Sequence, residues 1–177
     1  MKNRLNTRKL CISALIAAIY VALTIALAPI SYGALQFRVS ESLCVFPYFI
    51  PGTAWGLFAG CIIANLMTGN IFDVIFGSAA TLIASLLTAL IGKRRNTVRN
   101  RALACFIPVI VNAIVVSAVI TFAYNGNGSL KLYLINALQI AAGEAGVMYI
   151  LGLPLMKVVP KIKIISDIIK ENKYEGS

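Results

Sequence analysis

Long apolar segments separated by short polar ones dominate the pattern of this 177-residue chain. The first covers residues 10–30 without a charged residue, and its length of ~20 residues is what a helix needs to cross a bilayer. Most of the later apolar segments end at turns rich in Gly, Asn or Pro, which mark helix boundaries. The expected helices lie at approximately 10–30, 36–50, 53–68, 77–91, 103–124 and 130–158, followed by a cytoplasmic tail at 159–177.

The second of these segments is the least regular. Its apolar core, 43–50, is too short to span a bilayer alone. The helix is therefore expected to begin near Gln36 and to draw Arg38 and Glu41 into the membrane edge. Pro51 and the glycine after it end the segment.

Composition places the chain among integral membrane proteins. Hydrophobic residues make up 59% of it and charged residues 12%, whereas a soluble domain carries about 25% charge. The fold class is therefore all-α integral membrane, with residues 1–177 forming a single bundle of six transmembrane helices. The N-terminus resembles a signal peptide, but its apolar run exceeds the ~7–15 residues of a secretory signal, so we interpret it as a retained first helix.

The distribution of basic residues predicts the orientation. Of the 16 Lys and Arg residues, 14 precede the first helix, lie within 93–101, or lie at or beyond the end of the last helix; Arg38 and Lys131 are the exceptions. By the positive-inside rule both termini are cytoplasmic, in a multi-pass protein of the plasma membrane. The net charge of +10 therefore indicates topology and not binding to nucleic acid. The tail at 161–173 suits either a short helix on the membrane face or a frayed extension of the last helix.

Polar residues inside the last apolar segment mark a candidate ligand-binding pocket. Glu144 lies in the middle of the apolar stretch 132–156, which contains no other charged residue. A carboxylate at this depth is costly unless something pairs with it. At about 100° per residue, Tyr133, Asn136 and Glu144 fall within an arc of about 80° on one helix. Gln139 lies on the flank of this stripe.

With this topology, polar residues of other segments gather toward the outer face: Arg38, Glu41, Asn65 and Asp73. We expect them to line a pocket that opens outward, with Glu144 as its deepest polar group. For each of these acids an alternative to ligand contact stays open. The first is that Glu144 accepts a hydrogen bond from a neighbouring helix, with Asn112 as the candidate partner. The second is that Arg38 and Glu41, three residues apart, pair with each other, and the third is that Asp73 only forms a turn.

Two predicted helices carry stripes of small residues, which allow close approach of helix backbones. On the first helix the stripe is Ala14, Ala18, Ala22 and Ala26, and on the third it is Gly56, Gly60 and Ala64. For the third-helix stripe, packing inside the same bundle is the favoured of two explanations, the other being contact with a second subunit. For the first helix, packing inside the bundle and contact with a second subunit are both open.

Several residues and motifs that catalysis or metal binding requires are missing from the sequence, which limits the possible functions. The chain contains no histidine and no C-x-x-C pair, so we expect no metal site. We interpret its four cysteines as small buried apolar residues. It has no G-x-x-x-x-G-K-[ST] phosphate loop and no nucleophile–base pair, so we expect no catalytic residue, no cofactor and no enzyme activity. A binding subunit driven by partners fits best; a membrane enzyme or a structural or channel-like subunit are the alternatives.

Three blocks make the chain resemble a known family: R-x-S-E at 38–41, A-N at 64–65 and D-x-x-F-G-S-x-x-T at 73–81. In combination they resemble the QueT family, substrate-binding S components of energy-coupling factor (ECF) transporters associated with queuosine precursors. The resemblance covers nearly the whole chain. It implies a six-helix component that binds a micronutrient from outside and associates with a transmembrane coupling protein and two ATPase subunits. It also implies that Ala14 and Ala18 form the A-x-x-x-A element presented to the coupling protein.

The resemblance implies a ligand such as 7-aminomethyl-7-deazaguanine. A carboxylate accepts two hydrogen bonds from the N1–H and exocyclic amine of such a ring, and a second acid pairs with its aminomethyl cation. An aromatic side chain stacks on the ring, and the candidates are Tyr32, Phe37, Phe72 and Tyr133. The surplus of acids over Arg38 fits a neutral or cationic ligand. Cobalamin or another vitamin is the alternative ligand.

Overall fold

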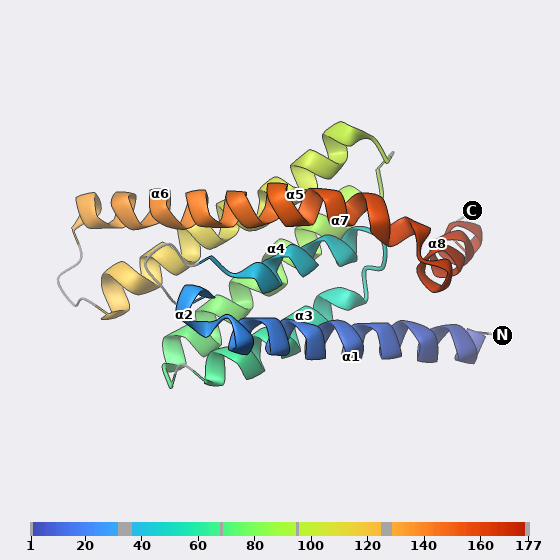
Figure 1. Ribbon diagram of the computed structural model, residues 1–177, viewed down its shortest axis with the longest axis horizontal. Coiled ribbons are helices and arrows are strands. Elements are labelled where there is room, and N and C mark those ends of the chain that lie inside the picture. Colours follow the sequence, from blue (N-terminus) through green and yellow to red (C-terminus); the bar gives the residue numbers. More distant parts are fainter. Residues whose placement is uncertain (1, 32–36, 68, 95, 125–128, 176–177) are drawn as a thin grey trace.

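The computed structural model describes residues 2–31, 37–67, 69–94, 96–124 and 129–175, and their regular structure is helical throughout (Figure 1). The α-helices are α1 (Lys2–Ala26), α2 (Ala28–Ser31), α3 (Thr53–Leu66), α4 (Ser78–Gly92), α5 (Val98–Ala118), α6 (Leu130–Val147), α7 (Leu153–Val158) and α8 (Lys163–Glu175). The 3₁₀-helices are η1 (Val39–Tyr48) and η5 (Val159–Lys161), and the π-helical segments are η2 (Asp73–Gly77), η3 (Val119–Tyr124) and η4 (Met148–Gly152).

Within the described part of the chain, four helical stretches are long and apolar enough to cross a bilayer: Thr7–Ala26, Asp73–Gly92, Val98–Ala123 and Leu130–Lys161. They confirm the expected membrane-embedded helical protein. The apolar helix α3 is shorter. Its 14 residues reach about 21 Å at 1.5 Å per residue, less than the ~30 Å of a hydrocarbon core. The count of six spans therefore stays a prediction.

The two chain ends lie at the same end of the molecule, called here the terminal end (Figure 1). The end of α4 and the start of α5 lie toward this end as well, whereas α3 ends and α6 begins toward the opposite end. The three basic segments of the sequence therefore gather on one side of the bundle. Which side faces the cytoplasm stays a prediction.

The second predicted helix is the main correction to the expected fold. In place of a spanning helix over 36–50, the structure has the ten-residue 3₁₀-helix η1. Pro47 lies inside it and supplies no backbone N–H, which weakens helical hydrogen bonding there. Eight of its ten residues are buried, and it packs against α1, α3, α4, α5, α6 and α7. In Figure 1 it lies in the middle of the bundle between α1 and α6, so it is a central element enclosed by the longer helices.

The small residues of α3 pack against α1. A Cβ atom added at Gly56 would lie 2.2 Å from the backbone oxygen of Ser13, and one added at Gly60 would lie 2.9 Å from that of Ala17. Both distances are too short for a side chain, so the two backbones require glycine here. The third-helix stripe therefore packs inside the bundle, as one alternative predicted. The alanine stripe of α1 instead faces outward, because Ala14, Ala18, Ala22 and Ala26 are all exposed.

The apolar core extends to the terminal end, where the tail forms a separate helix. After Pro160 the chain is extended at Ile162, and α8 then begins at a new angle (Figure 1). Ile165 and Ile168 of α8 are buried and pack against Met156 and its neighbours in the core. The tail is therefore a short helix packed on the bundle and not a continuation of the last span.

The prediction that all four cysteines are buried is confirmed for three of them. Cys44, Cys61 and Cys105 are free and buried, whereas Cys11 is exposed. The prediction is wrong for Cys11 because this face of α1 points away from the other helices.

Candidate ligand-binding site

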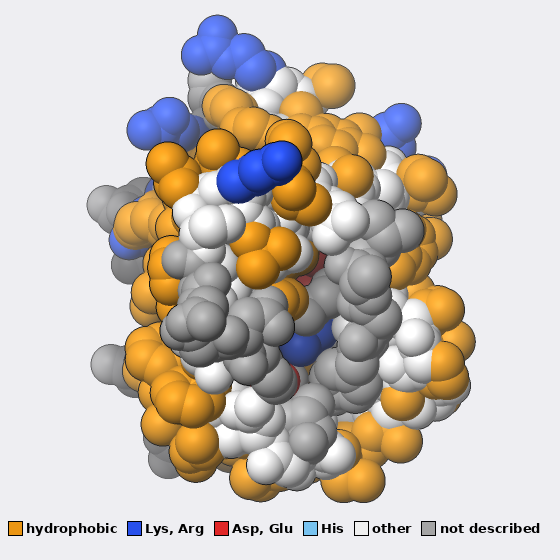
Figure 2. Space-filling view, turned by 90° about the vertical axis from the view of Figure 1, so that its left-hand side faces the viewer, with side chains coloured by type: hydrophobic (Ala, Val, Ile, Leu, Met, Phe, Trp, Pro, Cys, Tyr) orange, Lys and Arg blue, Asp and Glu red, His pale blue; other side chains and the backbone are white. Residues whose placement is uncertain are grey.

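Three charged side chains are buried among the described residues. Arg38 is 6% exposed, Glu41 0% and Glu144 2%. Arg38 precedes η1, Glu41 lies in its first turn, and Glu144 lies in α6. Figure 2 views the molecule from the end opposite the termini and shows a hollow with basic and acidic atoms at its bottom. Buried charges are costly in a membrane protein and typically mark a ligand or ion pathway.

Glu41 is held by side chains of three elements. Its Oε1 accepts hydrogen bonds from the hydroxyl of Tyr20 on α1 and from that of Thr81 on α4, the latter at 3.2 Å. Its Oε2 accepts from the thiol of Cys44, which lies 3.0 Å away on η1. Both carboxylate oxygens thus have partners inside the protein. The structure gives Glu41 the role of joining η1 to α1 and α4.

Glu144 has fewer partners than Glu41. Its Oε1 accepts one hydrogen bond, at 3.1 Å, from the Nδ2 of Asn112 on α5. This is the bond that the alternative interpretation of Glu144 predicted. Among the described residues no partner reaches the second carboxylate oxygen. This oxygen is therefore open to a further hydrogen bond, such as one from a ligand.

Arg38 and Glu41 both lie within electrostatic reach of the Glu144 carboxylate. One Arg and two Glu residues leave an excess of one negative charge when both acids are ionised. Such a site favours a ligand that brings a positive charge or hydrogen-bond donors.

An aromatic ring lies next to this part of α6. A Cβ atom added at Gly146 would lie 3.1 Å from the Cε2 atom of Phe37, so the ring packs directly over this glycine. Gly146 is two residues from Glu144. Of the four candidates for stacking on a ligand, Phe37 thus packs against α6, at a residue about 200° around the helix axis from Glu144. Tyr32 lies outside the described residues, and Phe72 is exposed and stacks on Phe76.

Asn65 and Asp73 meet where α3 leads into η2. The side-chain amide of the fully buried Asn65 donates to the backbone oxygen of Asp73 at 2.9 Å and to the hydroxyl of Ser78 at 3.4 Å. The same amide nitrogen lies 3.3 Å from the Sγ of Cys61. Asn65 therefore fixes the start of η2 and α4. The Asp73 side chain is only partly buried, as a residue at the rim of a site would be.

The predicted stripe on α6 faces α5 and η3. The Asn136 amide donates to the Thr121 hydroxyl at 2.9 Å, and the Tyr133 hydroxyl donates to the backbone oxygen of Ile114 at 3.4 Å. Glu144 faces the same neighbour through Asn112, so these three side chains lie on one side of α6. Gln139, on the flank of the stripe, is exposed, and the structure does not bring it to the buried charges.

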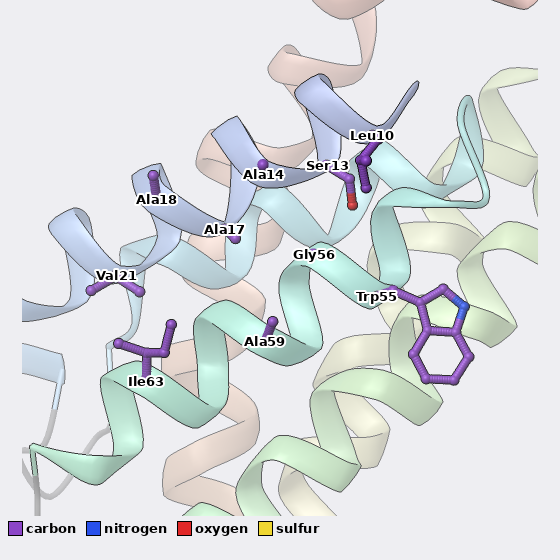
Figure 3. A pocket seen from close by; sticks show the side chains of 10 residues that line it. All are labelled: Leu10, Ser13, Ala14, Ala17, Ala18, Val21, Trp55, Gly56, Ala59 and Ile63. Carbon is purple, nitrogen blue, oxygen red and sulfur yellow. The ribbon is translucent and has the colours of Figure 1, made fainter. Parts of the chain in front are cut away.

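The outward face of α1 borders a groove shared with α3. The groove has a volume of about 480 Å³, and Ala14 and Ala18 line one wall of it (Figure 3). The other lining residues are Leu10, Ser13, Ala17, Val21, Trp55, Gly56, Ala59 and Ile63. Its lining is almost wholly apolar, so it suits contact with lipid or with an apolar helix of another protein.

Several residues of the buried network were not predicted from the sequence. Tyr20, Thr81 and Cys44 hold Glu41, and Thr24 bonds to Ser40 at 2.7 Å. The polar pair Tyr20 and Thr24, four residues apart within an apolar run, was a signal for a polar inner face on α1.

A helical membrane protein with charged groups buried at the bottom of a hollow belongs to the class of membrane binding and transport proteins. Comparison with known families makes the assignment specific: this chain belongs to the QueT transporter family, whose model matches residues 10–161. It is also similar to a protein named queuosine precursor transporter QueT from Lactococcus lactis subsp. cremoris (strain MG1363), with 42% identity over 72 residues. That match spans 40% of this chain and 43% of the relative. No solved structure matches the chain.

Proposed function

We propose that this protein is the substrate-binding S component of an ECF-type transporter and that it imports a queuosine precursor such as 7-aminomethyl-7-deazaguanine. The family assignment and the name of the Lactococcus relative support the transported class. The observation that carries the proposal is the buried carboxylate of Glu144, which has an oxygen without a partner among the described residues.

The chemistry of the hollow suits this ligand class. Glu144 accepts hydrogen bonds from the N1–H and 2-amino groups of a deazaguanine ring, which needs donors opposite the carboxylate. Phe37, which packs on Gly146 of the same helix, is the aromatic side chain proposed to stack on the ring. The excess negative charge attracts the aminomethyl cation, for which the carboxylate of Asp73 at the rim is the proposed partner. A phosphorylated ligand would be repelled by the same charge.

Glu41 takes a supporting part in this proposal. Because both of its oxygens accept hydrogen bonds within the protein, it positions η1, with Arg38 at its entrance, and does not meet the ligand directly. Asn65 supports the rim in a similar way by holding the backbone of Asp73. Tyr133 and Asn136 lie near the start of α6 and are proposed to line the outer part of the pocket.

Transport needs partners, since the sequence contains no phosphate loop for ATP. We assign energy supply to two ATPase subunits and a transmembrane coupling protein, and docking to the groove around Ala14 and Ala18. The exposed small residues leave room for a partner helix to approach closely. In this proposal the chain crosses the plasma membrane six times, with α3 and η1 completing the spans, and both termini are cytoplasmic.

Binding measurements on the detergent-purified protein test the proposal. Calorimetric titration with 7-aminomethyl-7-deazaguanine is expected to give saturable one-to-one binding, and mass spectrometry of the protein as purified is expected to detect a deazapurine. Tight binding of cobalamin without binding of any deazapurine would keep an S component but overturn the ligand. Absence of binding of either compound by folded protein would favour a structural or channel-like subunit.

A further inference from the structure

The Glu144–Asn112 pair uses only part of its hydrogen-bonding capacity. Glu144 is 2% exposed and Asn112 is 6% exposed, and a single bond of 3.1 Å joins them. The Asn112 amide has two N–H donors and one carbonyl oxygen, and only one N–H is engaged in the described chain. One carboxylate oxygen of Glu144 is also without a partner there. Two adjacent helices thus present unused polar atoms side by side within the bundle.

The carboxylate fixes which way the amide points. An ionised carboxylate only accepts hydrogen bonds, so the NH₂ group of Asn112, and not its oxygen, must face Glu144. The second N–H of this group is then held next to the carboxylate. The pair therefore offers a row of one donor, from Asn112, followed by two acceptors, from Glu144.

This row is the complement of one edge of a deazaguanine. That edge presents an acceptor, O6, followed by two donors, N1–H and the 2-amino group. When N1–H faces Oε1 and the 2-amino group faces Oε2, O6 lies on the side of Asn112, which bonds to Oε1. A 6-amino ring has a donor in place of O6 and an acceptor in place of N1–H, so the same row would oppose it at two positions.

We infer that Asn112 is a specificity-determining residue of the ligand site, which donates a hydrogen bond to the 6-oxo group of a 2-amino-6-oxo deazapurine held by Glu144. This inference rests on the proposed function and deepens it. It assigns to α5 a ligand contact that the family assignment does not supply. Asn112 has two tasks in this arrangement: one N–H orients Glu144 and the other meets the ligand.

The test compares two probes on three proteins and one control variant. The probes are 7-aminomethyl-7-deazaguanine and its 6-amino analogue, 2,6-diamino-7-aminomethyl-7-deazapurine. The proteins are the unmodified chain, Asn112→Leu, which has a similar size but no donor, and Asn112→Asp, which replaces the donor with an acceptor. Ser117→Ala is the matched control on α5, because its hydroxyl bonds only to backbone oxygens of its own helix.

The unmodified protein and Ser117→Ala are expected to prefer the 6-oxo probe by about a hundredfold, since two positions are mismatched in the analogue. Asn112→Leu should weaken the 6-oxo probe about tenfold to a hundredfold and shrink the preference. Asn112→Asp should shrink it further, because its oxygens repel O6 and accept from a 6-amino group.

The outcomes separate the inference from the proposed function. If the unmodified protein binds neither probe, the proposed function fails. If it binds both probes equally, or if Asn112→Leu weakens both by the same factor, Asn112 only orients Glu144 and the inference is wrong. The comparison of probes on the unmodified protein needs no variant, so equal binding of the two probes would overturn the inference even where a variant fails to fold.

Discussion

Tyr20 on α1 donates a hydrogen bond to the carboxylate of Glu41 on η1, and both side chains are fully buried. The two residues are 21 positions apart in the sequence and belong to different helices. The same carboxylate is also bonded to Thr81 on α4, 40 positions away. A single acid therefore ties the central 3₁₀-helix to helices on both sides of it.

Removing the Tyr20 hydroxyl should destabilise the protein. In Tyr20→Phe the ring stays but Glu41 loses a donor in a buried place, at an expected cost of about 1–3 kcal/mol. We expect a lower apparent Tm in detergent. Because η1 also carries the chain segment with Arg38, ligand affinity should fall to a smaller extent.

Tyr149→Phe is the matched control for this change. Its hydroxyl bonds to the backbone oxygen of Ala102 on the exposed surface of the bundle, where other partners replace it. A loss of stability as large in Tyr149→Phe as in Tyr20→Phe would show that the Glu41 network does not stabilise the fold.

Glu144→Gln should weaken binding of 7-aminomethyl-7-deazaguanine while leaving the fold intact. A glutamine oxygen still accepts from Asn112, but the new amide group opposes the donors of the ligand. The expected loss is about 1.5–3 kcal/mol, or about tenfold to a hundredfold in Kd. Calorimetric titration measures it, with Ser129→Ala as the control, since Ser129 only caps the start of α6. Unchanged affinity in folded Glu144→Gln would assign this acid to helix packing alone.

Gly146→Ala tests whether Phe37 lines the site. The added Cβ would lie 3.1 Å from the ring, so the ring must move by a few tenths of an ångström. If the ring stacks on the ligand, affinity should fall by about two- to tenfold, the range of an aromatic contact worth 0.5–1.5 kcal/mol.

Two further variants make this test specific. Phe37→Leu should weaken binding by a similar factor, and the double variant should lose less than the two effects combined, because both act through one contact. Gly52→Ala is the control, since a Cβ there meets nothing within 4 Å. Equal affinities across the series would mean that the ring lies outside the site.

The sequence predicted the long helices well and the buried contacts poorly. The helix expected at 77–91 is observed at Ser78–Gly92, because a long apolar run bounded by polar turns leaves few alternatives. The second segment was not predictable in this way. Its apolar core is short, and its 3₁₀ form depends on being enclosed by the other helices.

The contacts of the candidate site were likewise predicted only in part. The bond between Glu144 and Asn112 was anticipated, because both polar residues lie at mid-depth of neighbouring apolar helices. The partners of Glu41 were not, since Tyr20 and Thr81 meet it only after α1 and α4 have packed on η1. Helical periodicity places residues on a face, but which faces meet is decided by packing between segments distant in the sequence.

Cysteine labelling tests the topology. In a background with the exposed Cys11 changed to Ser, a cysteine at Lys131 should react with an impermeant reagent on intact cells, because α6 begins at the end opposite the termini. A cysteine at Asn96, in the basic connection between α4 and α5, should react only after permeabilisation. A cysteine at position 127, which lies outside the described residues and between the last two predicted helices, should react on intact cells as the one at Lys131 does. Labelling of Asn96→Cys from outside would reverse the orientation.

Large side chains on the outward face of α1 should separate transport from binding. Ala14 and Ala18 line the groove and are exposed, so Ala14→Leu/Ala18→Leu does not disturb contacts within the bundle. If a helix of the coupling protein docks there, the two leucines block its approach. We expect loss of ATP-dependent uptake in cells, with deazaguanine binding by the purified protein unchanged.

Two control variants show whether the loss of uptake is specific to the groove. Ala22→Leu/Ala26→Leu makes the same change on the same stripe, beyond the residues that line the groove, and should retain uptake. Gly56→Leu enlarges the inner face instead, where a Cβ would already lie 2.2 Å from the Ser13 oxygen, and should destabilise the protein itself. Uptake that survives Ala14→Leu/Ala18→Leu would remove the groove from the docking surface. Loss of binding in that variant would mean that the stripe supports the bundle, and the partner interface would then have to lie on another face.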